Sequence, residues 1–279
     1  MSLVVKRASQ PLTRPCPQLL VLSLGCAAAL RAEAPAKTTS LPAALRLRGG
    51  VSSETIVSVG AGLTAASGLL SYISPKTNLA AYKIPASLID DTALGAMRAV
   101  GCWQLALTAL LLAEPSKALA VSSFCPAAAI FLSIPAYEAF GTQKASAVVW
   151  VGILSALGKL GLDGKLPNWV APALFLVNGA QFFFTPSGAM SMYKAAKMPS
   201  ALGLSMVALQ GTMMLVMGAY VTALAAGLTH MQAFGIAWII NGALAAKWAV
   251  TEAPKFNTPK AGPLAWSAIS AVIAGLALK

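Results

Sequence analysis

The sequence predicts an all-α integral membrane protein whose eight transmembrane helices form two parallel four-helix repeats. Three observations lead to this fold class: long stretches without charge, residues that recur at a fixed spacing, and an uneven distribution of Lys between the loops. Of the 279 residues, 57% are hydrophobic and only 10% are charged, and the mean hydropathy is +0.73. A soluble domain carries roughly 25% charged residues, so the composition argues against a soluble fold.

The uncharged stretches have the length of membrane-spanning helices. No Lys, Arg, Asp or Glu occurs between Lys197 and Lys247, a stretch of 49 residues. A span needs roughly 20 mostly apolar residues, so this stretch has room for two. Shorter uncharged windows recur at Glu54–Lys76, Arg98–Glu114, Lys117–Glu138, Lys144–Lys159, Lys165–Lys194 and Lys260–Lys279.

The first 50 residues predict a cleavable targeting leader. Basic residues precede an apolar stretch at 19–30, which is the order of a signal peptide and too short for a span. We expect a signal peptide over about residues 1–34 and a basic, hydroxylated, transit-like segment over residues 35–50, which contain no acidic residue. This arrangement resembles the bipartite leaders of algae with secondary plastids, although no Phe follows the candidate cleavage sites. The resemblance implies a plastid membrane, and the endoplasmic reticulum or another secretory-pathway membrane is the alternative.

A first set of residues recurs 111 positions further along the chain. Ser74-Pro75 followed by Tyr82-Lys83 recurs as Thr185-Pro186 followed by Tyr193-Lys194. Self-similarity at a fixed spacing is the signature of internal duplication. The motif therefore predicts that the chain holds two copies of one unit.

A second set supports the same division at a spacing of 116. Thr142-x-Lys144-Ala145 with Trp150 recurs as Thr258-x-Lys260-Ala261 with Trp266. We therefore expect a first four-helix repeat over residues 51–165 and a second over residues 166–279. The predicted helices are 55–73, 94–113, 118–137 and 145–162 in the first copy, and 168–185, 201–226, 230–250 and 262–278 in the second.

The distribution of Lys predicts the topology. Loops after odd-numbered helices hold most of the basic residues, namely Lys76, Lys83, Lys144, Lys194, Lys197, Lys255 and Lys260, whereas loops after even-numbered helices hold Lys117 and Lys165. The positive-inside rule places the odd loops in the cytosol or stroma. Because each copy has an even number of helices, both copies run in the same direction.

Five polar residues in the predicted spans are candidate substrate-binding residues: Arg98, Gln104, Asn178, Gln210 and Asn241. An ionisable side chain inside a membrane is a functional-site hypothesis. The alternative is that Arg98 extends to the interface and pairs with Asp91 as a topology anchor. Gln and Asn side chains in a span face other helices or a cavity, so they either join helices or bind a ligand.

No pattern predicts a catalytic, cofactor-binding or metal site. The four Cys residues have no C-x-x-C spacing and the chain has one His. Neither a nucleophile–base pair nor a glycine-rich phosphate loop is present. The sequence therefore favours a non-enzymatic protein without excluding an enzyme that acts on lipid, and it leaves the cofactor unknown.

The net charge of +12 does not indicate a nucleic-acid partner. Beyond the leader, the basic residues lie singly between hydrophobic runs, as loop charges that orient helices do. The expected partners are the lipid bilayer and subunits of a membrane complex, with no nucleic acid.

The stretch Gly95–Leu107, which opens a helix after a loop with Pro and Tyr-Lys, resembles the small DoxX-like four-helix membrane proteins. The resemblance covers one helix of each copy, implies the four-helix unit and transfers no activity. The leading hypothesis is a carrier for a small solute or lipophile with its site between the repeats. The alternative is a structural or assembly subunit of a membrane complex, for example a photosynthetic one.

Overall fold

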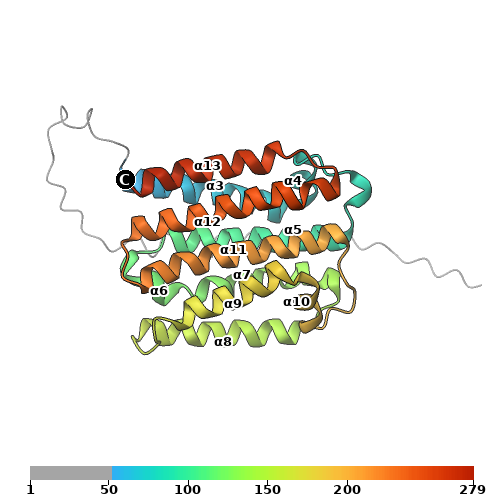
Figure 1. Ribbon diagram of the computed structural model, residues 1–279. Helices are drawn as coiled ribbons and strands as arrows, with labels where there is room; N and C mark the ends of the chain where they lie inside the picture. Colours follow the sequence, from blue (N-terminus) through green and yellow to red (C-terminus); the bar gives the residue numbers. More distant parts are fainter. Residues whose placement is uncertain (1–51) are drawn as a thin grey trace, which may run out of the picture. The chain divides into compact units, whose positions relative to one another are not determined.

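The computed structural model describes residues 52–279, and these residues are helical, with no β-strand among them (Figure 1). The predicted leader lies outside the described residues. The helices are α3 (Ser53–Ile73), α4 (Pro75–Ala81), η1 (Ala86–Leu88), α5 (Asp91–Leu111), α6 (Pro115–Val121), α7 (Phe124–Tyr137), η2 (Glu138–Phe140), α8 (Lys144–Leu162), α9 (Val170–Phe184), α10 (Pro186–Met192), α11 (Ala201–Ala225), α12 (His230–Thr251), η3 (Ala253–Phe256) and α13 (Ala261–Ala277).

Each of the eight predicted ranges lies on a helix, and the prediction of an all-α chain with several apolar helices is confirmed for the described residues. Five of these helices, α3, α5, α8, α11 and α12, are long and apolar enough to cross a membrane. The predicted third helix is interrupted: α6 and α7 meet at a bend of 51° and would form a sixth span if they cross together. Helices α9 and α13 are apolar but shorter.

Two helices lie at the centre of this part of the chain. Helix α11 packs against α5, α9 and α12, and α5 packs against α3, α7 and α11. Over their most apolar 18 residues, 72% of α11 and 67% of α5 are buried, whereas only 11% of α8 is. In Figure 1, α5 and α11 run between the α3, α12 and α13 group and the α7, α8 and α9 group. The central pair therefore joins the other long helices.

Glycines allow the closest helix contacts. A Cβ at Gly101 of α5 would lie 2.6 Å from the Gly68 carbonyl oxygen of α3, and a Cβ at Gly211 of α11 would lie 2.8 Å from the Gly179 carbonyl oxygen of α9. Side chains of any size would push these helices apart, which is why small residues concentrate at such interfaces in membrane proteins. Gly179 follows Gly68 by 111 residues, and Gly211 follows Gly101 by 110.

The recurring Ser/Thr-Pro…Tyr-Lys residues adopt the same backbone at both places. Ser74 and Thr185 have φ, ψ of −131°, 60° and −133°, 59°, and each precedes a short helix with Pro at its start, α4 and α10. Proline fits the first helical position because its missing N–H has no partner there. The sequence motif did not predict these two short helices.

The Lys of each motif ends its short helix in the left-handed region. Lys83 has φ 57° and Lys194 φ 52°, and the amide of each donates to a carbonyl three residues earlier, Ala80 and Ser191 respectively. The next amide, of Ile84, reaches back five residues to Leu79. This is the Schellman arrangement, which usually takes Gly at the left-handed position. The Thr-x-Lys-Ala motifs follow the same kind of turn.

In those turns the left-handed residues are Gly141 and Asn257, with φ 63° and 52°. Thr142 then donates its amide to Tyr137, and Thr258 donates to Ala253. Asn and Gly are the residues that adopt this conformation at least cost. The repeated sequence motifs thus mark four helix ends that close in the same way.

The first turns of α5 and α11 meet one another. Asp90 and Ser200 are the N-caps of these helices and accept the amides of Ala93 and Gly203. The Ser200 hydroxyl lies 3.2 Å from the Asp90 carboxylate. Partial burial alone would raise the pKa of the Asp90 carboxyl, but hydrogen bonds from Ala93, from the Thr92 hydroxyl and from Ser200, together with nearby Lys197, lower it. Asp90 is therefore ionised at neutral pH and holds both helix starts.

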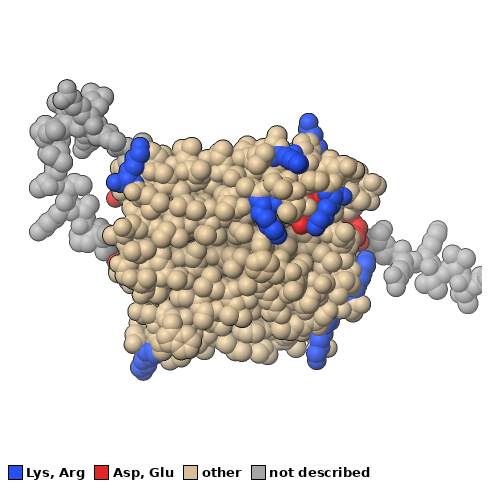
Figure 2. Space-filling model, viewed as in Figure 1, with Lys and Arg blue, Asp and Glu red and all other residues tan. Residues whose placement is uncertain are grey.

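Charged side chains gather toward the two ends of the helices, and a broad area of the face in Figure 2 carries none. The ion pairs among the described residues also lie near helix ends: Lys117 with Glu114, Lys144 with Glu138, Lys159 with Asp163 and Lys255 with Glu252. Exposed pairs of this kind contribute little stability. Because these pairs lie at the helix ends, they add no charge to the apolar middle of the helices.

We expect Gly211→Ala to destabilise the protein by about 1–3 kcal/mol, because the new methyl group would lie 2.5 Å from the Phe183 amide nitrogen. Thermal unfolding in detergent, followed by tryptophan fluorescence, measures the effect. Gly152→Ala in α8 is the control, since a Cβ there meets no atom within 4 Å. Equal melting temperatures for the two variants would show that the α9–α11 contact is not tight.

Candidate functional site

Two pockets open between the helices of the described region. The first, which we name the α8 pocket, has an empty volume of about 900 Å³ that includes its mouth, and residues from α5, α7, α8, α9, α10 and α11 line it. The second, the α13 pocket, has about 720 Å³ and is lined from α3, α4, α5, α11, α12 and α13. The space that the centre of a water molecule can occupy is smaller, about 80 Å³ in the α8 pocket and about 90 Å³ in the α13 pocket, which is still several times what one water molecule needs.

Aromatic side chains dominate the α8 pocket. Its wall contains Trp103, Tyr137, Trp150, Phe175, Phe182 and Tyr193. The remaining lining is largely aliphatic, for example Ile130 and Leu154. Such a wall favours flat or ring-containing apolar groups, because aromatic pairs add binding energy beyond their buried area.

Several residues of the α13 pocket lie 110, 111 or 116 positions in sequence from residues of the α8 pocket. Trp266 lies 116 residues after Trp150, and Tyr82 lies 111 residues before Tyr193. Further pairs at spacings of 110, 111 and 116 are Trp103 with Met213, Gln104 with Met214, Ser67 with Asn178, Leu79 with Met190 and Ala147 with Pro263. The two pockets are therefore built from matching positions, with different side chains at most of them.

A hydrogen-bond network fills the polar side of the α13 pocket. Asn78 Nδ2 donates to Ser71 Oγ over 2.8 Å, and Ser71 Oγ lies 3.2 Å from Gln104 Oε1. Gln104 Nε2 in turn donates to Ser67 Oγ over 3.0 Å. The residues 111 positions after Ser71 and Asn78 are Phe182 and Ala189, which cannot form the same network. The Asn78 and Gln104 amides of the α13 pocket are thus bonded within the protein.

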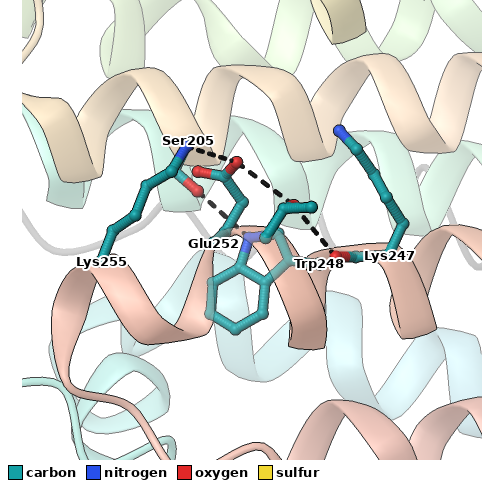
Figure 3. A network of polar contacts seen from close by, with 6 residues as sticks. Ser205, Lys247, Trp248, Glu252 and Lys255 are labelled. Carbon is teal, nitrogen blue, oxygen red and sulfur yellow. Dashed lines mark hydrogen bonds and ion pairs between the residues drawn. The ribbon is translucent and has the colours of Figure 1, made fainter.

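Trp248 forms another part of the α13 pocket wall. Its indole nitrogen donates to Ser205 Oγ over 3.1 Å, which ties α12 to α11 (Figure 3). Lys247, Glu252 and Lys255 lie around this tryptophan in Figure 3 but are not part of the pocket lining. No charged side chain lines either pocket.

Three of the five sequence-predicted site residues line a pocket. Gln104 and Asn241 line the α13 pocket, where Asn241 Nδ2 donates to Ser270 Oγ over 3.4 Å. Asn178 lines the α8 pocket and donates to the Leu174 carbonyl of its own helix. The structure thus distributes these three residues over two sites.

The other two residues lie elsewhere. Gln210 is fully buried, accepts a hydrogen bond from the Tyr137 hydroxyl at 3.0 Å and donates to the Ala96 carbonyl, so it joins α11 to α5 and α7. Arg98 is half-buried on α5 and lines neither pocket. No ion pair between Arg98 and Asp91 occurs in this part of the chain.

The sequence did not single out the aromatic walls. Their residues come from six helices, and an aromatic side chain in an apolar stretch looks the same whether it faces lipid or a pocket. The one available signal is the pair Trp150 and Trp266 in the repeated motif, which by itself indicates a repeat and not a pocket.

Within residues 52–279, no group of three or more His, Cys, Asp or Glu side chains is placed to hold a metal ion. Comparison of the chain with protein-family models, with curated proteins and with solved structures finds no significant match. The resemblance to DoxX-like proteins therefore stays a prediction.

We expect Ser71→Ala to destabilise the protein by about 1–3 kcal/mol, because it leaves the buried Asn78 amide without its acceptor. Thermal unfolding in detergent measures the change. The matched control is Ser191→Ala, whose exposed hydroxyl donates only to the Ser187 carbonyl of its own helix. A Ser71→Ala melting temperature no lower than that of the control would contradict the role of the network.

Proposed function

We propose that this protein is a membrane-embedded carrier that binds an uncharged lipophile in the α8 and α13 pockets. The observation that carries this proposal is the lining of the two pockets, which contains aromatic and aliphatic side chains and no charge. Burying a charged solute against such a wall would cost far more than a few hydrogen bonds return. A small charged solute, which the sequence alone left open, is therefore disfavoured.

The proposed carrier has eight spans. Helices α9 and α13 contain 15 and 17 residues, which correspond to about 22 and 26 Å at 1.5 Å per residue. A bilayer core is about 30 Å thick, and short spans are accommodated by local thinning. Both helices pack against long spans, α9 on α11 and α13 on α12, and the bent pair of α6 and α7 supplies the remaining crossing.

The proposed carrier also consists of two parallel copies of one four-helix unit. Three kinds of correspondence support this: the motif turns with matching backbone angles, the glycine contacts of α3 with α5 and of α9 with α11, and the matching pocket positions. The copies would divide between α8 and α9. Each pocket then takes one wall from each copy, as binding sites in duplicated transporters do.

The orientation follows from the charges at the two ends. The end that holds the loops after α3, α7, α9 and α12 carries nine basic residues, counting Arg98 and Lys247, and four acidic ones, whereas the opposite end carries four and three. The positive-inside rule supports placing the first end in the cytosol or stroma.

A plastid membrane is the proposed location, and its support is the order of basic, apolar and hydroxylated segments in residues 1–50. Expression of the full chain with a C-terminal fluorescent protein in an alga with secondary plastids tests it. Fluorescence in the endoplasmic reticulum at steady state would favour the secretory alternative.

Photolabelling tests ligand binding in the pockets. Benzophenone, an uncharged aromatic lipophile, is added to the full chain in lipid nanodiscs, activated with light, and located by peptide mass spectrometry. We expect labelled peptides from the linings of the α8 and α13 pockets. Ala147→Phe fills the α8 pocket and should reduce labelling there about fivefold or more, because occupancy of a filled pocket requires overpacking that costs about 1–3 kcal/mol.

Three control variants sharpen this experiment. Ala145→Phe lies on the exposed face of the same helix and should leave labelling unchanged, as should Arg98→Gln, since Arg98 lines neither pocket. Ala245→Phe fills the α13 pocket and should reduce labelling only there. Labelling confined to outward side chains such as Val148 and Val149, with none in the pocket linings, would contradict the proposal.

The second candidate, a structural subunit of a membrane complex, has one observation in its favour. Helix α8 is the least buried of the five long helices and exposes Val148, Val149 and Ile153, a surface that suits lipid and a protein neighbour alike. Transfer of the labelled lipophile between vesicles, faster with the purified chain alone than without it, would separate a carrier from a subunit that acts only within a complex.

A further inference from the structure

We propose that the α8 pocket, and not the α13 pocket, recognises a lipophile that carries a hydrogen-bond-accepting oxygen such as a ketone or quinone carbonyl. This inference rests on the proposed function and names the ligand class of one of its two sites. It follows from buried donors without partners, from the break between α6 and α7, and from the contrast between the two pockets.

Two buried polar groups in the α8 pocket lack partners. Trp103 is 3% exposed and Ser123 is 2% exposed, and both line this pocket. Neither Trp103 Nε1 nor Ser123 Oγ has a hydrogen-bond partner. The Tyr137 hydroxyl donates to Gln210, and its oxygen lies near the Trp103 indole but without the geometry of a hydrogen bond.

An unpartnered buried donor is costly, so native proteins rarely keep one without a reason. Among the described residues only three buried side-chain nitrogen or oxygen atoms are unpartnered, and two of them line this one pocket. The indole N–H can only donate. A ligand that satisfies it must therefore present an acceptor, and the uncharged wall calls for a neutral one.

The break between α6 and α7 places one of these donors. Ser123 is the residue before α7, and its side chain caps no amide of that helix. The helix begins Phe124-Cys125-Pro126, and unwound segments of this kind line binding sites in other membrane transport proteins. The interruption thus brings a hydroxyl to the pocket wall that an unbroken helix would have bonded to its own carbonyls.

Three other polar side chains of the α8 pocket are already bonded within the protein. Thr142 Oγ1 donates to the Tyr137 carbonyl, Ser146 Oγ to the Gln143 carbonyl and Asn178 Nδ2 to the Leu174 carbonyl. Gln143, Trp150 and Tyr193 also carry donors in the lining, but none of these residues is buried. Trp103 and Ser123 are therefore the buried donors left to bind a ligand oxygen.

The α13 pocket lacks these features. At the position matching Trp103 it has Met213, which has no N–H to donate, and its wall helix α12 is continuous over His230–Thr251. Its amides are bonded to Ser67, Ser71 and Ser270. None of the three unpartnered buried atoms belongs to its lining. The Tyr82 hydroxyl and the Trp266 indole N–H also line it, but neither residue is buried, so the α13 pocket offers a ligand no buried unpartnered donor.

A matched pair of probes tests the inference. Benzophenone carries one carbonyl, and diphenylmethane has the same two rings with a methylene in its place. In nanodiscs of the full chain, benzophenone affinity is taken from saturation of photolabelling and diphenylmethane affinity from competition, both expressed per lipid. At the α8 pocket we expect benzophenone to bind about fivefold more tightly, the value of one net hydrogen bond, and at the α13 pocket we expect equal affinities.

Variants assign the preference to the two donors. Trp103→Phe keeps an aromatic ring and removes the N–H, and Ser123→Ala removes the hydroxyl. Each should lower benzophenone affinity at the α8 pocket about threefold or more and leave diphenylmethane affinity within about twofold. Trp266→Phe, in the α13 pocket, is the control and should leave the α8 preference intact. Ser123→Ala decides the matter if Trp103→Phe does not fold.

The outcomes separate the two proposals. Equal affinity of both probes at the α8 pocket of the unaltered chain, with no effect of Ser123→Ala, overturns the carbonyl preference and leaves the lipophile carrier standing. Failure of both probes to label or compete at either pocket overturns the carrier, and the carbonyl preference with it.

Discussion

The close contact of helix backbones at glycines is the constraint on which the rest of this structure depends. In a bilayer, lipid tails are as apolar as leucine, so helices associate through packing and hydrogen bonds and not through the hydrophobic effect. The Gly68–Gly101 and Gly179–Gly211 contacts supply that packing between α3 and α5 and between α9 and α11. With these pairs fixed, other helices complete the walls of the two pockets, for example with Trp150 of α8 and Trp266 of α13.

Much of the fold followed from the sequence because membrane spans have a simple physical signature. Charge-free windows located the helices, and α8, predicted at 145–162, runs over Lys144–Leu162. The break at Ser122 and Ser123 could not be found in this way, since a bent span and a straight one have the same hydropathy. The short helices α4 and α10 were missed because seven residues carry too little periodicity to detect.

The candidate site was harder to predict for a different reason. Polarity predicts Gln104, Asn178 and Asn241 as site residues, and each does line a pocket. Gln210 is equally polar, but its side chain is hydrogen-bonded to the Tyr137 hydroxyl and the Ala96 carbonyl. Polarity alone does not separate a side chain that binds a helix from one that binds a ligand. To separate the two roles, one must know which donors already have hydrogen-bond partners within the protein. This depends on contacts between helices that are far apart in sequence.

The two lysines in the left-handed backbone region, Lys83 and Lys194, bear on the proposed depth of the helix bundle in a bilayer. Lys83 and Lys194 hold a conformation that glycine would adopt at roughly 1–2 kcal/mol less cost, so an ammonium group occupies the turn at the expense of backbone strain. Both are exposed and both follow a tyrosine. A Tyr-Lys pair fixed to a rigid turn suits the boundary between acyl chains and headgroups. In the proposed carrier, two such pairs at one end would anchor that end of the helix bundle at the membrane–water interface.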